Sequence, residues 1–269
     1  MKPGNGAMGP VRDAFGSAVR AISAKDSISF IVPCFNEAEN VAATVGSIRA
    51  AMNDLDYEII LVDDCSTDET LARMHELARD DPRIVVLHNE VNLNFGGAYK
   101  RGLRAARAEY SMMLPGDNGF PAESIAEVAR HAGAADIIIP TVINQGARPW
   151  YRMVGSRGFT TLLNWLFWLK VGYYNGAVLQ RTDLLRKIEI RTNSFAYQAE
   201  ALVKLTAGGA SYTHCQVRIN EREVGRSSAL RWRNQKAVLK TIFHLIAAVG
   251  PFRTRPRSTQ ADWAARERP

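Results

Sequence analysis

Short apolar runs rich in β-branched residues recur between residues 27 and 140, separated by segments in which apolar residues have helical spacing. The runs occupy 27–33, 57–62, 83–87, 110–114 and 136–140. After Glu58 the second run shows no polar alternation, as expected of a parallel strand covered by helices on both faces. This order predicts an α/β fold in which a mostly parallel central sheet is flanked by helices.

After Pro140 the alternation of apolar runs and helical segments is less regular. The later segments indicate a helix at 151–171, a strand at 177–180, a helix at 195–207, a strand at 212–219 and a basic apolar helix around 237–249. We expect one domain at 27–230, with a first half at 27–140 and a second half at 141–230. Residues 1–26 are expected to be a flexible tail, 231–250 an amphipathic basic helix and 251–269 a disordered tail.

Positive charge is concentrated near the C-terminus. The 269 residues carry a formal net charge of +7, and the ten basic residues between Arg218 and Arg257 are opposed only by Glu221 and Glu223. Such an excess suits the phosphates of a nucleotide, a lipid headgroup or a nucleic acid. Because no aromatic-rich RNA- or DNA-binding motif accompanies the charge, nucleic acid is the partner that the sequence favours least.

The cysteines and the N-terminus indicate a cytoplasmic protein. Cys34, Cys65 and Cys215 are odd in number and far apart, without the close pairs of a zinc site. Free thiols of this kind suit a reducing compartment. The first 26 residues lack the apolar core of a signal peptide.

Two apolar stretches, 159–169 and 237–249, bear on membrane contact. Neither reaches the roughly 18 to 20 apolar residues that span a bilayer. Trp165 and Trp168 fit either a packed core or an interfacial element beside Lys170. With the basic residues of the second stretch, they also fit peripheral docking at the inner face of an anionic membrane.

Acidic and amide residues follow three of the expected strands. They are Asn36 and Glu37, then Asp63, Asp64 and Asp68, then Asp117. The carboxyl ends of parallel strands meet at one edge of a sheet, where α/β folds bind ligands. Carboxylates there can accept hydrogen bonds from a ribose or base, and they can hold a divalent cation on a diphosphate. The alternative is that these acids are solvated turn residues, since Gly-Asp-Asn-Gly is good turn chemistry.

Four stretches together resemble family 2 glycosyltransferases of GT-A fold. They are Pro33-Cys-Phe-Asn-Glu37, Val62-Asp-Asp-Cys-Ser-Thr-Asp68, Asn92 to Gly97, and the Asp117 corner. Within that family, residues 27–230 are similar to the polyprenyl-phosphate (dolichol-phosphate) sugar transferase branch. The resemblance implies an inverting transfer of a sugar from a nucleotide-diphosphate sugar to an acceptor, preferentially a polyprenyl phosphate. The alternatives are a soluble sugar or natural-product hydroxyl as acceptor, or a catalytically weak nucleotide-sugar-binding protein.

The resemblance also implies roles for donor-side residues. The nucleotide would contact Pro33, Phe35, Glu37, Asp63 and Asp64. Asp117 would be the second acid of the family's Asp-x-Asp metal motif and would bind Mg²⁺ or Mn²⁺. This sequence departs from the motif because Pro115 stands at the first acid position and Gly119 replaces a glutamine that sometimes assists the metal.

The resemblance also implies roles for residues in three further segments. Arg152 and Ser156 lie four residues apart on one helical face and would bind the acceptor phosphate; the alternative is an exposed arginine and a helix-start serine. Arg222, Gly225 and Ser227 resemble a mobile loop that closes over the donor, its arginine meeting the diphosphate charge; the alternative is a plain surface loop. Glu200 would be a general base toward a hydroxyl, would orient cationic side chains if the acceptor is a phosphate, or is an exposed helix acid.

Overall fold

The computed structural model describes residues 26–52, 56–144, 150–174, 176–220 and 232–250, with the side chains of 150–154 and 232–238 excepted. Its strands are β1 (Ile28–Cys34), β2 (Tyr57–Asp63), β3 (Ile84–His88), β4 (Tyr110–Met113), β5 (Ile137–Val142), β6 (Leu179–Arg181) and β7 (Tyr212–Val217). Its helices are α1 (Val41–Met52), α2 (Thr70–Arg79), α3 (Phe95–Ala105), α4 (Ala122–Arg130), α5 (Trp150–Phe167), α6 (Thr182–Lys187), α7 (Tyr197–Ala207) and α8 (Trp232–Val249). Residues 1–25 of the expected tail at 1–26, and all of the expected tail at 251–269, lie outside the described residues.

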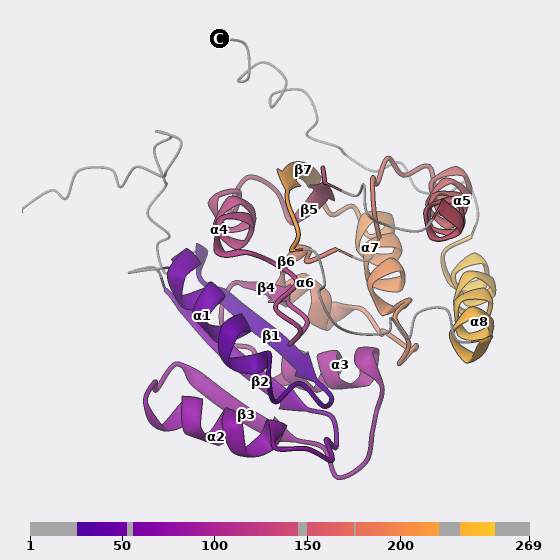
Figure 1. The fold of residues 1–269 in the computed structure, drawn as a ribbon. Coiled ribbons are helices and arrows are strands. Elements are labelled where there is room, and N and C mark those ends of the chain that lie inside the picture. The colour runs from indigo at the N-terminus through magenta and orange to yellow at the C-terminus, as the bar shows by residue number, and fades with distance from the viewer. Residues whose placement is uncertain (1–25, 53–55, 145–149, 175, 221–231, 251–269) are drawn as a thin grey trace, which may run out of the picture.

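One seven-stranded sheet organises these elements, in the order β3-β2-β1-β4-β6-β5-β7 (Figure 1). Strands β3, β2, β1 and β4 run parallel to one another, and β5 and β7 run parallel to each other. Strand β6 runs antiparallel to both β4 and β5. The predicted α/β fold with a mostly parallel sheet is confirmed, whereas the reversal of β6 was not predicted.

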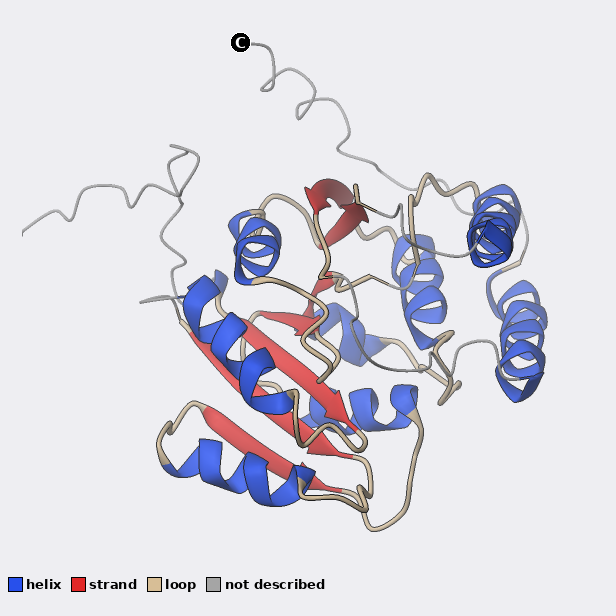
Figure 2. Ribbon diagram, viewed as in Figure 1, coloured by secondary structure: helices blue, strands red, loops and turns tan. Residues whose placement is uncertain are grey.

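Helices cover both faces of the sheet (Figure 2). One apolar core lies between the sheet and helices α1, α2 and α4, and it contains Phe30, Val45 and Val128. The second core lies on the opposite face, where α3 and α7 pack on the sheet and α5 and α8 contribute Leu163 and Leu245. Strands β1 and β2 are buried along their whole length because both faces are covered.

Helix α5 ends earlier than predicted. Trp168 adopts a left-handed backbone conformation with φ of 53°, which a helix cannot continue through. The side chain of Asn164 then binds the backbone of Val171, donating to its carbonyl at 2.9 Å and accepting from its amide at 3.3 Å. The expected helix at 151–171 therefore stops at Phe167.

Candidate active site

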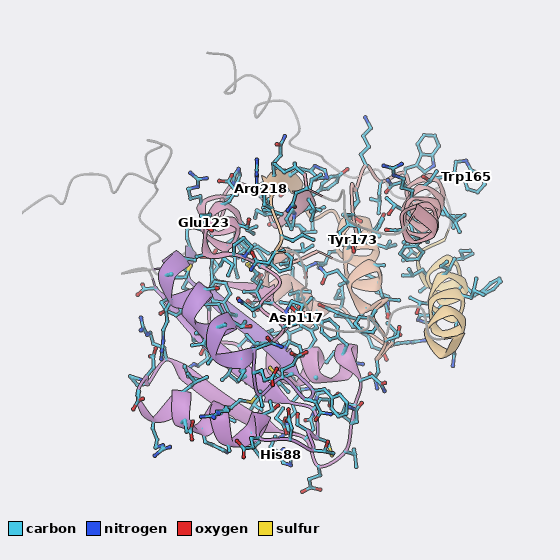
Figure 3. All side chains as sticks on the ribbon, viewed as in Figure 1. His88, Asp117, Glu123, Trp165, Tyr173 and Arg218 are labelled. Atoms are coloured by element: carbon cyan, nitrogen blue, oxygen red, sulfur yellow. The ribbon has the colours of Figure 1, made fainter. Side chains whose placement is uncertain are left out.

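The carboxyl ends of β2 and β4 flank the end of β1. The Asp64 amide donates to the Cys34 carbonyl at 2.8 Å on one side, and the Gly116 amide donates to the Pro33 carbonyl at 3.2 Å on the other. Asp64 and Asp117 therefore reach the same edge of the sheet, as the sequence predicts. In Figure 3, Asp117 follows β4 and His88 ends β3, two positions along this edge.

The chain turns sharply at each of these strand ends. Asn36, Cys65 and Asn118 have φ values of 57°, 65° and 52°, and Asn94, just before α3, has 63°. Residues other than glycine rarely adopt this left-handed backbone conformation, and such backbone strain clusters at functional sites. Four strained corners around one sheet edge are therefore a functional signal independent of the acids.

The loops after β1 and β2 are bound to each other. Asn36 accepts hydrogen bonds through Oδ1 from the amide and hydroxyl of Thr67, at 2.9 and 3.3 Å. Asp68 accepts from the Ala38 amide at 3.3 Å and from the Thr70 amide at 3.0 Å. Burial opposes the effect, but the hydrogen bonds from Thr70 and Ala38 hold the pKa of Asp68 below its usual value. Asp68 thus fastens the two loops together.

The hydrogen bonds between the two loops hold Phe35 and Glu37, the two residues after β1 that the sequence predicts to contact the donor. Phe35 is 49% exposed, so its ring is accessible to a planar base. Glu37 is half-buried, and its Oε2 accepts from the Asn40 side chain at 2.8 Å. Pro33 is buried within β1, where its carbonyl rather than its ring contributes to the edge.

Asp64 is held from the far side by the segment after β3. Its Oδ1 accepts from the Asn89 side-chain amide at 2.7 Å and from the Leu93 backbone amide at 2.8 Å. Asn92 also donates to the Asp64 carbonyl at 3.1 Å. Oδ2 takes no hydrogen bond from the described residues, so it is the oxygen left for a ligand.

Asp63 does not lie where the sequence places it. Its side chain is completely buried, and Oδ2 is 2.7 Å from Nδ1 of His88. Oδ1 is buried without a hydrogen-bond partner among the described residues. A carboxylate so enclosed cannot contact a donor in this conformation. We therefore correct its expected role: Asp63 joins the ends of β2 and β3 beneath the site.

The Asp117 corner is tied to α1 and to the chain after β7. Oδ1 of Asp117 accepts from the Gly119 amide at 3.1 Å. The Asn118 amide donates to Thr44 Oγ1 at 3.0 Å. Asn220 donates from its side chain to the Asn118 carbonyl at 2.9 Å and from its amide to the Gly119 carbonyl at 3.0 Å. The chain thus passes beside Asp117 two residues before Arg222.

Glu200 has a structural environment. Its side chain is buried, and it accepts from the amides of Arg191 and Thr192 at 3.0 Å each and from Lys204 Nζ at 2.6 Å. Burial alone would raise its pKa, but the hydrogen bonds from Lys204 and the two amides hold it below the usual value. A carboxylate with both oxygens occupied is a poor general base. The geometry favours the alternative in which Glu200 orients its neighbours, and it contradicts an exposed helix acid.

The remaining residues that the sequence predicts to form the site are only partly described. Arg152 lies in the first turn of α5 and its side chain is outside the described residues, whereas Ser156 is half-buried on the same helix. Arg222, Gly225 and Ser227 lie outside the described residues. In the part of the chain that is described, no helix is both long enough and apolar enough to cross a bilayer.

The described residues also bear on metal binding. They contain no group of three or more His, Cys, Asp or Glu side chains that could hold a metal ion. Asp117 stands half-exposed at the edge. Mg²⁺ commonly uses one or two carboxylates and completes its shell with substrate phosphates and water. The donor set therefore fits a metal held mostly by a diphosphate, and not an all-protein metal site.

Comparison with solved structures identifies the class of fold. Glucosyl-3-phosphoglycerate synthase from Mycobacterium tuberculosis, in complex with UDP, superposes with a TM-score of 0.63 at 13% identity, covering 82% of this chain and 80% of that one. A mannosyltransferase from Pyrobaculum calidifontis, in complex with GDP-Man and Mn²⁺, gives 0.60 at 20% identity, covering 82% and 64%. The fold is that of GT-A glycosyltransferases.

The sequence defines the family. The model of glycosyl transferase family 2 matches residues 29–189, more than half of the chain, and the protein belongs to that family. Polyprenol monophosphomannose synthase of Mycolicibacterium smegmatis is 29% identical over 212 residues, 73% of this chain and 78% of the relative. Undecaprenyl-phosphate mannosyltransferase of Micrococcus luteus is 26% identical over 214 residues, 73% and 85% respectively. The predicted resemblance to the polyprenyl-phosphate branch is confirmed.

Proposed function

We propose that the protein transfers a sugar from a nucleoside-diphosphate sugar to a polyprenyl phosphate. The observation that carries the proposal is the placement of Asp64 and Asp117 at strand ends on either side of β1. Two inter-strand steps separate them by about 10 Å, a span suited to a nucleoside at one end and a diphosphate at the other. The names of the two curated relatives support the choice of acceptor.

The donor half provides contacts along this span. The exposed Phe35 ring would stack on the base, and the open oxygen of Asp64 would accept a hydrogen bond from the nucleoside. Asp117 would hold Mg²⁺ or Mn²⁺ against the diphosphate, and the ion, when bound, would neutralise charge on the leaving group. The Asn118 and Asn220 hydrogen bonds would keep Asp117 in place during the reaction.

The reaction is a single displacement. An oxygen of the acceptor phosphate forms a bond to the anomeric carbon while the bond to the diphosphate breaks, so the electron pair leaves with the diphosphate and the configuration inverts. A phosphate is ionised at neutral pH, so no general base is needed, in keeping with the occupied carboxylate of Glu200. Arg152 and Ser156 would bind the acceptor phosphate, and Arg222 would meet the charge on the leaving diphosphate.

An apolar face would bring the enzyme to its lipid substrate. Helices α5 and α8 lie at the same end of the molecule (Figure 1), and Trp165 projects from α5 (Figure 3). We name this the docking face; its exposed members are Leu162, Trp165, Trp168, Leu239 and Phe243. Large apolar side chains with a net charge of +7 suit an anionic bilayer.

The assay follows from the acceptor. GDP-mannose and UDP-glucose are each incubated with undecaprenyl phosphate, detergent and Mn²⁺ or Mg²⁺, and radiolabelled sugar is extracted into organic solvent. The expected result is an extractable product from one donor. If the radiolabelled sugar is transferred but the product stays in the aqueous phase, the acceptor is soluble and the proposal of a lipid acceptor is rejected.

A substitution tests the site itself. We expect Asp117→Ala to lower turnover at least about a hundredfold, the size of effect seen when a positioned electrostatic contact is removed. Asp80→Ala, on an exposed acid after α2, is the matched control and should leave turnover unchanged. Turnover by Asp117→Ala near the wild-type rate would refute the proposed site.

A further inference from the structure

A chain of side-chain hydrogen bonds leads from α3 to the donor-side carboxylate. Nη1 of Arg101 donates to Oδ1 of Asn89 at 2.6 Å, and Nδ2 of Asn89 donates to Oδ1 of Asp64 at 2.7 Å. Asn89 and Asp64 are only 1% and 3% exposed. The Asn89 backbone is also fixed, because its amide donates to the Asp63 carbonyl at 2.8 Å.

The direction of this chain is set by the arginine. A guanidinium group only donates hydrogen bonds, so it requires the oxygen of the Asn89 amide to face it. The NH₂ group of the amide must then face Asp64. Without Arg101 the oxygen of the amide loses its partner, and among the described residues the bond to Asp64 is the one side-chain hydrogen bond that still orients the Asn89 amide.

The Leu93 amide donates to the same oxygen of Asp64 at 2.8 Å. Two donors on Oδ1 restrain the carboxylate and leave Oδ2 without a hydrogen bond from the described residues. A carboxylate held in this way needs no reorganisation when a ligand arrives, and such preorganisation increases affinity.

We propose that Asn89 and Arg101 are positioning residues that align Asp64 for the nucleoside of the donor. This inference rests on the proposed function, and it predicts an effect confined to the nucleoside. The diphosphate would lie at the Asp117 end of the edge, whereas the hydrogen bonds from Arg101 through Asn89 end at Asp64. Loss of Arg101 should therefore weaken nucleotide binding and leave pyrophosphate binding unchanged.

The experiment measures affinity with two probes. UDP and GDP are titrated into the full-length protein by calorimetry in the presence of Mg²⁺, and inorganic pyrophosphate is titrated in parallel. For the better nucleotide, we expect Arg101→Met to raise Kd about tenfold, the loss expected when a charge-assisted hydrogen bond is removed. Arg101→Lys keeps a donor and should recover most of the affinity. Arg104→Met removes the same charge from an exposed position on α3 and is the matched control.

A second variant tests Asn89, the residue that links Arg101 to Asp64. Asn89→Asp keeps the shape and the acceptor for Arg101 but replaces the donor to Asp64 with a repelling oxygen, so it should weaken nucleotide binding at least as much. Unchanged nucleotide affinity in Arg101→Met overturns the inference. An equal loss for pyrophosphate also overturns it, because that outcome marks a merely structural role. A wild-type protein that binds neither nucleotide refutes the proposed function as well.

Discussion

Gly96 provides a quantitative test of how the two halves of the molecule fit together. It is the second residue of α3, and its amide donates to the Asn193 carbonyl at 2.9 Å. A Cβ at this position would lie 2.8 Å from the Ser194 carbonyl oxygen and 2.9 Å from the Asn193 carbonyl carbon. Both are backbone atoms that cannot rotate away, so Gly96→Ala must displace the segment that links α6 to α7.

The expected loss follows from three effects. Overpacking of this kind destabilises a protein by about 1–3 kcal/mol, and loss of the hydrogen bond to Asn193 adds about 0.5–1.5 kcal/mol. Alanine is a better helix former than glycine by about 0.5–1 kcal/mol, which opposes the other two. The free energy of unfolding should therefore fall by about 0.5–4 kcal/mol, with a central value of about 2 kcal/mol.

Urea unfolding followed by circular dichroism measures this change. Gly46→Ala in α1 is the matched control, because nothing lies within 4 Å of the Cβ that it adds. Only the helix-forming advantage then operates, and the control should be more stable than wild type by about 0.5–1 kcal/mol. If Gly96→Ala proves as stable as Gly46→Ala, the close approach of α3 and residues 193–194 is wrong.

Two further predictions concern Glu200 and the docking face. The depressed pKa of Glu200 gives stability that is present above its ordinary value of 4.5 and is lost as pH falls through the folded-state pKa. Glu200→Gln should thus be less stable than wild type by about 2–3 kcal/mol at pH 7, with a gap in urea unfolding that narrows below pH 4.5; a gap independent of pH would contradict this. The double substitution Trp165→Ser with Phe243→Ser should weaken cosedimentation with phosphatidylglycerol vesicles at least about tenfold. Val91→Ser, at an equally exposed apolar site in the loop after β3, should not weaken it. Equal binding by the wild type and both variants would rule out the docking face.

The first half of the domain could be predicted from sequence because its signals are local. Each strand of β1 to β4 is an apolar run, and each parallel strand delivers its following residues to the same edge. The pattern also shows that one of two adjacent acids after β2 must point inward. The pattern does not show which of the two acids points inward, because that depends on β3. His88, at the end of β3, contacts the carboxylate of Asp63, and the segment after His88 donates a hydrogen bond to Asp64.

Other features depend on contacts between distant segments. Thr67 has the residue type of a helix cap, yet α2 begins only at Thr70, whose amide is taken by Asp68. Glu200 looks like an exposed helix acid until Arg191 and Thr192 are seen to donate to it. The supporting role of Asn89 was missed although it has the same signal as the acids, a polar side chain directly after a strand.

The reversed direction of β6 determines which part of the chain completes the sheet edge beside Asp117. Leu179, at the start of β6, pairs with Met112 near the end of β4, so the edge next to Asp117 is completed by chain entering a strand and not by chain leaving one. That entering chain comes directly from α5. The residues expected to contact the nucleoside (Phe35, Glu37 and Asp64) all come from the first half of the sequence. The Asp117 corner is also held from the second half, because Asn220 donates hydrogen bonds to the Asn118 and Gly119 carbonyls.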